Sequence, residues 1–275
     1  MKMRWIGTLA LAVLCACPLR TFAQGSRLTG IAHVAYRVSN LDQEIAFLQK
    51  LGFEEAFSST RNGNTTQIFV KINNRQFIEI YPQTDPSQPL GWMHVCYESH
   101  DLNALYNTLV AHGLKPRPVE KAGAGNLISS LMDPEGRVTE FTQYMPGSRH
   151  TLDRGKHLGR NRVSDAIAGF ELPVPDMAAA MRFYTAGLGF TARDTGTGAR
   201  IRITNRPLPW ILLRPAGTRA RPRLFFTVKD TAAAARQLRA AGLRVERRGR
   251  RLVVTDPDGN PFVFVSARVH RRRRR

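Results

Sequence analysis

The feature that most constrains the fold is a pattern of strands and a helix that occurs four times along the chain, at a period of about 50 to 60 residues. The first copy opens with β-branched and aromatic residues at 31–41, which predict a strand, and continues with a helix at 42–53 whose apolar residues share one face. Further strands are expected at 54–58, 66–72 and 76–82. The predicted order is β-α-β-β-β.

The other three copies follow the same order. In the second, the helix is expected at 102–113, and strands at 91–99, 114–119, 126–132 and 137–144. The segments AFLQKLGF and RFYTAGLGF, and the turns DPEG and DPDG, align the first half of the chain with the second. The stretch between the halves is rich in glycine and charge and has no apolar period. We therefore predict domains at 28–145 and 165–267, joined by a linker at 146–164.

Several of these segments resemble the vicinal oxygen chelate superfamily: HVAYRVSNL, LGF before the second strand, and DPEGRVTEF or DPDGNPFVF before the last strand. That superfamily includes glyoxalase I, extradiol dioxygenases, fosfomycin-resistance enzymes and bleomycin-binding proteins. The resemblance implies an α+β fold, in which four βαβββ units form two glyoxalase-like domains with curled mixed sheets. It is specific for fold and not for reaction, because the superfamily hosts several chemistries on one scaffold.

The resemblance also implies a metal site, because two units pair into a cup with ligands from the first and last strand of each. The matching positions are His33 and Glu79 in the first unit, and His94 and Glu140 in the second. Each His is 46 residues from its Glu, so the two repeats carry the same residue types at the same spacing. A pseudo-twofold site requires this. The alternative is that all four are ordinary surface or hydrogen-bonded strand residues.

Two imidazoles and two carboxylates suit one divalent metal ion, such as iron, manganese, nickel or zinc. Four protein ligands leave one or two coordination positions for water or for a substrate with two adjacent oxygens. Either Glu79 or Glu140 could leave the ion and act as a catalytic base.

Side chains alternate across a strand, so residues two away from each ligand should share its face. This places Arg37 in the cup as an anion-pairing candidate, with a strand-edge charge in solvent as the alternative. The expected aromatic wall suits a small aromatic or carboxylated ligand. The predicted substrate-binding residues are Arg37, Phe77, Tyr81, Trp92 and Tyr144. Ile31, Ala35, Cys96, Glu98, Val138 and Thr142 should share that face, and Val34, Tyr36, Ile78, Ile80, Val95 and Phe141 should face the helices.

The second half keeps the fold pattern but not the ligands. Its equivalent positions are Gly169, Leu212, Arg223 and Val263, so no metal site is expected there. This half is expected to be a packing partner for the first, with capping of the cup or anion binding through Arg214 and Arg223 as alternatives. The linker residues His150 and His157 are expected in solvent, unless the linker folds over the cup.

The charge is uneven. Residues 1–150 carry 14 Lys and Arg against 12 Asp and Glu, and residues 151–275 carry 27 against 9. The arginines are scattered without interleaved aromatic residues, so a solvated surface is favoured over a nucleic-acid site. The run HRRRRR ends a basic tail at 268–275, which is expected to be disordered.

The first 23 residues read as a secretory signal peptide, with basic residues at Lys2 and Arg4, a short apolar run and a small residue at Ala23. Export, periplasmic or secreted, is therefore expected. A variant interpretation takes Leu14–Cys17 as a lipoprotein box, and only then would the chain contact a membrane, through Cys17. Cleavage at Ala23 would leave Cys96 as the single cysteine and no internal disulfide.

The leading functional hypothesis is a metal-dependent lyase, isomerase or dioxygenase that acts on a small molecule. Within the resembled families, extradiol dioxygenases use two His and one Glu, whereas a glutamate at the position of Glu79 resembles glyoxalase I. Export argues against glyoxalase I itself, which needs a cytosolic thiol. The alternatives are a non-catalytic binder of the bleomycin-resistance type and a polyanion-binding second half. Nothing in the sequence predicts the oligomeric state.

Overall fold

The computed structural model describes residues 27–217 and 220–267, which form two eight-stranded mixed sheets. The first sheet has the order β2-β3-β4-β1-β5-β8-β7-β6 and the second the order β10-β11-β12-β9-β13-β16-β15-β14. The first contains β1 (Leu28–Val38), β2 (Glu54–Arg61), β3 (Asn64–Lys71), β4 (Phe77–Pro82), β5 (Gly91–Ser99), β6 (Glu120–Lys121), β7 (Leu127–Met132) and β8 (Val138–Gln143). The second contains β9 (Ile167–Val174), β10 (Thr191–Asp194), β11 (Ala199–Arg202), β12 (Trp210–Pro215), β13 (Arg223–Val228), β14 (Glu246–Arg248), β15 (Arg251–Thr255) and β16 (Pro261–Ser266).

The helices are few and short, and a side chain caps the start of each α-helix. Asn40, Asp101, Asp176 and Asp230 accept a hydrogen bond from a first-turn amide of α1 (Leu41–Lys50), α2 (Leu102–Ala111), α4 (Met177–Arg182) and α5 (Thr231–Ala240). The helix α4 continues as a π-helical turn, η1 (Phe183–Gly187), and α3 (Arg149–Leu152) is a single turn between the domains. No helix among the described residues is long and apolar enough to cross a membrane.

The element order confirms four βαβββ units, and within each sheet two units pair through their first strands, β1 with β5 and β9 with β13. One expected strand is misplaced. Residues 114–119 are not a strand, and the short β6 follows them. Pro116 and Pro118 explain the difference, because proline lacks the amide hydrogen that a ladder needs.

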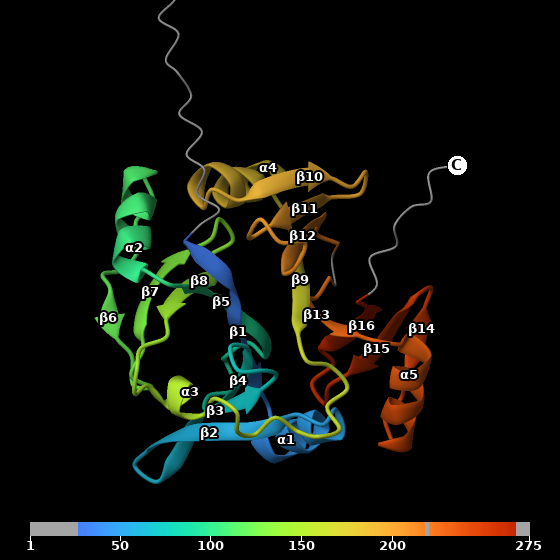
Figure 1. Ribbon diagram of the computed structural model, residues 1–275. Coiled ribbons are helices and arrows are strands. Elements are labelled where there is room, and N and C mark those ends of the chain that lie inside the picture. Colours follow the sequence, from blue (N-terminus) through green and yellow to red (C-terminus); the bar gives the residue numbers. More distant parts are fainter. Residues whose placement is uncertain (1–26, 218–219, 268–275) are drawn as a thin grey trace, which may run out of the picture.

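The helix-side faces of the two sheets share one hydrophobic core. Figure 1 shows β1 and β5 of the first sheet beside β9 and β13 of the second, with α1 and α4 at the two ends of the junction. Aromatic pairs cross this junction: Phe53 contacts Phe226 at 5.6 Å between ring centroids, and Tyr97 contacts Phe190 at 5.5 Å. Because the sheets pack through their helix sides, their two concave faces point away from each other.

The linker is folded onto the first domain. Lys71 is 1% exposed on β3, and its ammonium donates to the carboxylate of Asp153 at 2.5 Å and to the Asp153 carbonyl. Further along, the amide of Val163 donates to the carbonyl of Leu51 at 2.9 Å. A buried charge needs such a partner, so this ion pair fixes the segment that holds α3.

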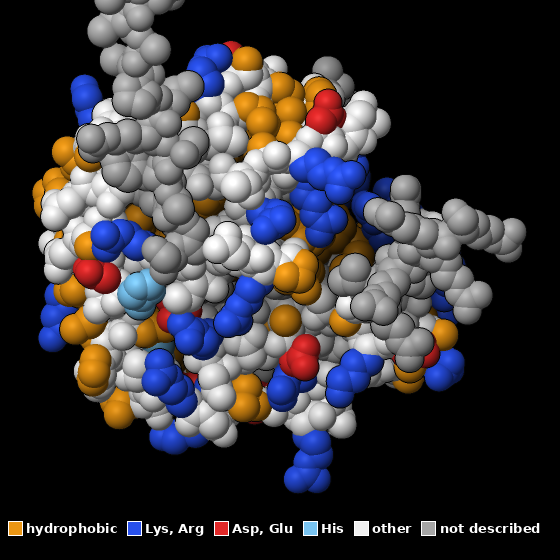
Figure 2. Space-filling model, turned by 45° about the horizontal axis from the view of Figure 1, so that its top comes forward, with side chains coloured by type: hydrophobic (Ala, Val, Ile, Leu, Met, Phe, Trp, Pro, Cys, Tyr) orange, Lys and Arg blue, Asp and Glu red, His pale blue; other side chains and the backbone are white. Residues whose placement is uncertain are grey.

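The expected signal peptide, the lipoprotein box and the basic tail lie outside the described residues. On the described surface, Figure 2 shows Lys and Arg side chains dispersed over much of one face, with one gathering near the β10–β11 hairpin. That gathering belongs to the basic second half.

A buried carboxyl group lies in the junction between the domains. Glu44 of α1 is 1% exposed, and neither of its carboxyl oxygens has a hydrogen-bond partner. Burial raises its pKa to about 9, and the nearby charges of Asp256 and Asp258 in the second domain add to the shift. Glu44 is therefore protonated at neutral pH in the folded protein.

This burial predicts that stability falls as the pH rises. Between the ordinary glutamate pKa and about 9, folded Glu44 keeps a proton that the unfolded chain releases, so each pH unit costs about 1.4 kcal/mol of unfolding free energy. Urea unfolding between pH 7 and 8.5 should show this slope. Glu44→Gln should flatten it and raise stability at pH 8.5.

The matched control is Asp42→Asn, which removes an exposed carboxylate from the same turn of α1. Asp42→Asn should keep the wild-type slope. A wild-type stability that stays constant or rises over this pH range would contradict the neutral buried state of Glu44.

Candidate metal centre

Strand register brings the four predicted ligands to one face of the first sheet. Ala35 of β1 lies opposite Glu79 on β4 and opposite His94 on β5. His33 lies opposite Cys96, which in turn lies opposite Glu140 on β8. The two strands that carry histidine are thus direct neighbours, and each is flanked by a strand that carries glutamate.

The four side chains converge on one point. The Nε2 atoms of His33 and His94 are 3.0 Å apart, and Oε2 of Glu79 is 3.0 Å from the first and 3.2 Å from the second. Oε1 of Glu140 is 3.5 Å from the His33 nitrogen. One ligand atom each of His33, His94 and Glu140 lies within 4.8 Å of the other two. Three of these residues are buried, and the Glu140 side chain is 19% exposed.

The spacing fits a shared cation. Two donor atoms that each lie about 2.1 Å from one ion, at a right angle, are about 3.0 Å from each other. The contacts among His33, His94 and Glu79 have this length. The facing atoms of these three side chains all direct lone pairs at a common centre. A single proton there could join only two of these atoms in a hydrogen bond. The donor set therefore fits a divalent ion of the borderline class.

The electrostatics of the cluster favour positive charge at its centre. Burial alone would lower the pKa of His33, but the carboxylates of Glu79 and Glu140 raise it, and the net shift is upward. Burial alone would raise the pKa of Glu79, but the two imidazoles lower it, and the net shift is well downward. Glu79 is therefore ionised, and a metal ion would compete with a proton for the same nitrogen.

A cavity of about 410 Å³ opens above the cluster on the concave face. Its wall includes Tyr81, Tyr144 and His150, together with Phe69 and the segment 120–124. The hydroxyl of Tyr81 accepts a hydrogen bond from Gln67 at 2.7 Å. Burial, followed by the charges of Glu79 and Glu140, raises the pKa of Tyr81, so this hydroxyl keeps its proton. The site is a metal-competent floor under a mixed aromatic and polar wall.

Two of the predicted substrate-binding residues, Tyr81 and Tyr144, line the cavity. Phe77 is fully buried behind the wall, with its ring 4.8 Å from that of His150. Arg37 is half-buried at the end of β1, where it donates to the Pro89 carbonyl at 3.2 Å, and it does not line the cavity.

Trp92 lies on the other face of the sheet, so its expected place in the cup is wrong, and so is that of Ile31. The Trp92 ring packs 5.8 Å from Tyr36 and 5.1 Å from Phe170 of the second domain. The cause is a pair of β-bulges, since the β1–β5 register shifts between Ile31 and His33 and again beside Trp92. An extra residue reverses the alternation on which the expectation depended.

A linker residue completes the wall. His150 of α3 is 4% exposed, and its ring contacts Phe57 and Phe69 edge-on. The Asn126 amide oxygen accepts from the backbone amide of Met145 at 3.1 Å, so the Asn126 nitrogen donates to Nδ1 of His150 at 2.8 Å. Nε2 then carries the imidazole proton. Burial, followed by the charge of His33, lowers the pKa of His150 to about 3, so the ring is neutral.

The expected solvent exposure of His150 is wrong. The alternative, that the linker folds over the cup, gives the observed position. The sequence did contain a signal for the short helix α3, because the hydroxyl of Ser148 caps its start by accepting a hydrogen bond from the Thr151 amide. His157 lies outside the cavity, where Nδ1 contacts the Asp153 carboxylate at 2.5 Å with 43% of its side chain exposed.

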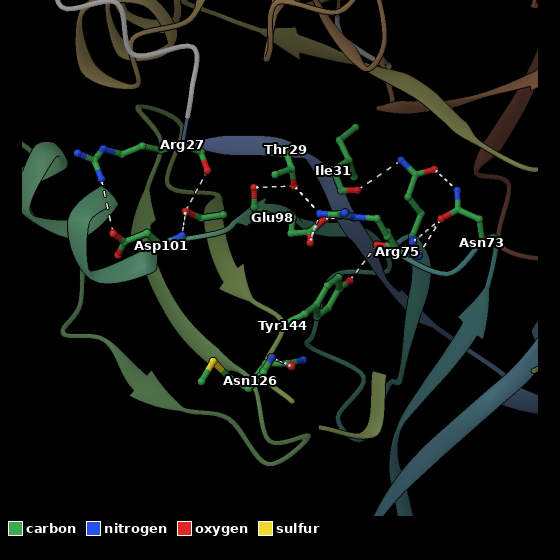
Figure 3. A network of polar contacts seen from close by, with 12 residues as sticks. Arg27, Thr29, Ile31, Asn73, Arg75, Glu98, Asp101, Asn126 and Tyr144 are labelled. Carbon is green, nitrogen blue, oxygen red and sulfur yellow. Dashed lines mark hydrogen bonds and ion pairs between the residues drawn. The ribbon is translucent and has the colours of Figure 1, made fainter. Parts of the chain in front are cut away.

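A polar network holds Tyr144 against His150. Figure 3 shows the Tyr144 hydroxyl directed at Arg75, whose carbonyl it contacts at 2.9 Å. The Arg75 guanidinium donates to both oxygens of Glu98, at 2.5 and 2.8 Å. The Tyr144 ring stacks on His150 at 5.1 Å between centroids. Glu98, expected in the cup, thus serves to position the wall.

Comparison with known proteins identifies the family. The sequence model of the glyoxalase/bleomycin resistance protein/dioxygenase superfamily matches residues 30–141 and 166–264. The chain belongs to this superfamily. No curated protein sequence matches the chain significantly.

Solved structures with the same fold are distant in sequence. A catechol 2,3-dioxygenase superposes with a TM-score of 0.68 at 16% identity, with 88% of each chain covered. A Mn(II)-bound glyoxalase from Novosphingobium aromaticivorans gives a TM-score of 0.68 at 17% identity, covering 88% of this chain and 83% of that one. A homoprotocatechuate 2,3-dioxygenase variant from B. fuscum gives 0.65 at 15% identity, covering 89% and 73%. These likenesses support the fold.

The second superfamily domain has the same register without the ligands. Glu171 lies opposite Leu212 and Arg223, as Ala35 lies opposite Glu79 and His94. Gly169 and Val263 take the places of His33 and Glu140. A Cβ at Gly169 would lie 2.0 Å from the Trp210 carbonyl oxygen, so no larger residue fits there without a shift. The described part of this domain contains no metal-competent cluster.

The site predicts one bound divalent ion per chain. Purified protein loaded with manganese(II) or zinc(II) should retain about one equivalent after desalting, by elemental analysis. Glu140→Gln should lower retention at least about tenfold, because it removes a charged ligand. Retention should also weaken as the pH falls, because protons compete at His33.

The control for this measurement is Glu120→Gln. Glu120 is an exposed carboxylate that lines the same cavity without joining the cluster. Its variant should retain metal as the wild type does. Equal loss from both variants would mean that cavity charge, and not coordination by Glu140, holds the ion.

Proposed function

We propose that the protein is a divalent-metal-dependent enzyme of the vicinal oxygen chelate superfamily that acts on a small molecule with two adjacent oxygens. The supporting observation is the convergence of His33, His94, Glu79 and Glu140 at the floor of a cavity. A purely structural role would not require four lone-pair donors at one buried point.

His33, His94, Glu79 and Glu140 would hold the ion. A divalent cation there would polarise a carbonyl oxygen and lower the pKa of a carbon acid or hydroxyl next to it. Six-coordinate geometry leaves two positions beyond four protein ligands, which matches a substrate with two adjacent oxygens. Glu140, the most exposed of the four side chains, also lines the cavity.

The remaining chemistry belongs to the side chains around the floor. Glu79 is ionised and buried, so it can accept a proton from a substrate carbon or hydroxyl beside it. Tyr81 keeps its proton and can donate a hydrogen bond to an oxyanion. The neutral His150 ring and Tyr144 form a flat wall that limits where a substrate can lie.

The position of Glu79 favours a lyase or isomerase reaction. Its oxygen contacts both imidazole nitrogens, so Glu79 would serve as a fourth ligand. With four protein ligands, a six-coordinate ion would keep two positions for a chelating substrate and none for dioxygen.

A dioxygenase is the second candidate. His33, His94 and Glu140 by themselves make the two-histidine, one-carboxylate set used by non-haem iron oxygenases. In that case Glu79 would not be needed to bind the ion in the working enzyme.

Chelation can be tested with cobalt(II)-loaded protein, whose visible spectrum reports the ligands. Acetohydroxamate, which has two adjacent oxygens, should shift the spectrum in a saturable way, and acetamide at the same concentration should not. Glu140→Gln should abolish the shift, and Glu120→Gln should retain it. If acetohydroxamate leaves the spectrum unchanged, the open positions are not available to a chelating substrate.

The two reaction types differ in their need for oxygen. With an α-hydroxyketone in deuterium oxide, a lyase or isomerase site should catalyse deuterium incorporation next to the carbonyl without oxygen uptake, and Glu79→Gln should slow it by about 100-fold or more. Iron-dependent oxygen uptake with a catechol, retained in Glu79→Gln, would instead establish the dioxygenase candidate.

We also propose that the protein is exported, on the basis of the signal-peptide pattern at residues 1–23. N-terminal sequencing of the mature chain from its native host should begin at Gln24. A chain that retains Met1 or Lys2 would contradict export by cleavage, and a lipid-modified Cys17 would establish the lipoprotein variant.

A further inference from the structure

The concave face of the second sheet contains a large basic cavity that the proposed metal chemistry does not use. Its volume is about 810 Å³, and its lining includes Arg193, Arg200, Arg202 and Arg251. None of the lining residues is an Asp or Glu. The floor is formed by Trp210 and Phe225, whose rings are 4.9 Å apart, within a separate small hydrophobic cluster.

The strand register places like charges side by side. Arg193 of β10 lies directly opposite Arg200 of β11, and alternation brings Arg202 to the same face. In the first sheet the corresponding cross-strand pair is Phe57 and Phe69. Like charges directly opposite in an antiparallel pair are unfavourable. The second cup therefore carries a repulsive cluster where the first carries an aromatic wall.

Two of the guanidinium groups are held in place by the floor. The guanidinium of Arg200 lies 4.7 Å from the Trp210 ring centre, and that of Arg251 lies 5.5 Å from the Phe225 ring centre. Burial and the charge of Arg251 lower the pKa of Arg200. An arginine stacked on a ring keeps its N–H edge free and loses less freedom when it binds an oxyanion.

Other arginines of this domain have acidic partners. Arg214 and Arg223, for which anion binding was an alternative in the sequence analysis, both pair with Glu171, at 3.3 and 3.2 Å. Arg248 pairs with Glu246 at 2.8 Å. The arginines of the cavity make no ion pair with any carboxylate in the described parts of the chain. Figure 2 shows a gathering of Lys and Arg side chains near the β10–β11 hairpin, which carries Arg193 and Arg200.

We propose that this second cup binds a small organic polyanion, one that carries at least two carboxylate or phosphate groups, through Arg200, Arg202 and Arg251. Oxyanions accept paired hydrogen bonds from guanidinium groups, and the cavity volume suits a small molecule. Binding would relieve the repulsion between Arg193 and Arg200. The site is independent of the metal centre, because the two concave faces point in opposite directions.

The test is isothermal titration of the full chain with benzene-1,2,4,5-tetracarboxylate and, separately, with pyrophosphate. At least one probe should bind saturably at one per chain, and the preferred probe distinguishes a carboxylate from a phosphate ligand. Arg200→Gln/Arg251→Gln should weaken that binding at least about tenfold. Quenching of Trp210 fluorescence should report the same event and should be lost in Trp210→Phe.

The matched control is Arg236→Gln/Arg239→Gln, which removes the same charge from exposed positions of α5 in the same domain. This control, a chain that ends at Ala267 and the metal-site variant His33→Ala should all bind the probe as the wild type does. Arg202→Gln removes charge without removing a ring contact, so it serves if the double variant does not fold. Equal weakening in the control pair would overturn the proposal. Failure to bind either probe would also overturn it, including the case in which single-stranded DNA, titrated in parallel, binds and the two probes do not.

Discussion

The antiparallel pairing of β1 with β5 is the constraint on which the candidate metal centre depends. It sets His33 and His94 on neighbouring strands, and their Nε2 atoms meet at 3.0 Å. Each flanking strand then adds one glutamate through parallel pairing, β4 with β1 and β8 with β5. The site therefore belongs to neither repeat alone. The four side chains meet only when two units join one sheet, so the candidate metal centre requires paired units.

The same pairing also shapes what surrounds the centre. A bulge beside each histidine directs Ile31 and Trp92 to the helix side, where Trp92 packs on Phe170 of the second domain. The sheet that holds the ligands is thereby fastened to the other domain through a shared core. A second domain without a metal cluster still has a physical role, because it covers the helix side of the sheet that positions the ligands. Its own concave face is left free to acquire different side chains.

The sequence predicted most of the fold and the metal-competent cluster, for reasons that are local. Strand alternation and the equal spacing of the two His–Glu pairs depend on backbone periodicity, which is visible in a single chain. The errors arose where an extra residue changed that periodicity or where distant contacts decided the outcome. Trp92 was misplaced by a bulge, and His150 is buried because Lys71 and Asn126 hold the linker. The pairing of Arg223 with Glu171 likewise depended on cross-strand register.

The central claim is that the four side chains share one ion, and anomalous diffraction from crystals grown with manganese(II) or zinc(II) tests it most directly. The account predicts a single strong anomalous peak in the first domain, about 2.0 to 2.3 Å from Nε2 of His33, Nε2 of His94 and an oxygen of Glu140, with Glu79 at a similar distance. A map without a peak among these residues, in crystals whose metal content is established, would contradict the account. A peak in the second cup instead would do the same.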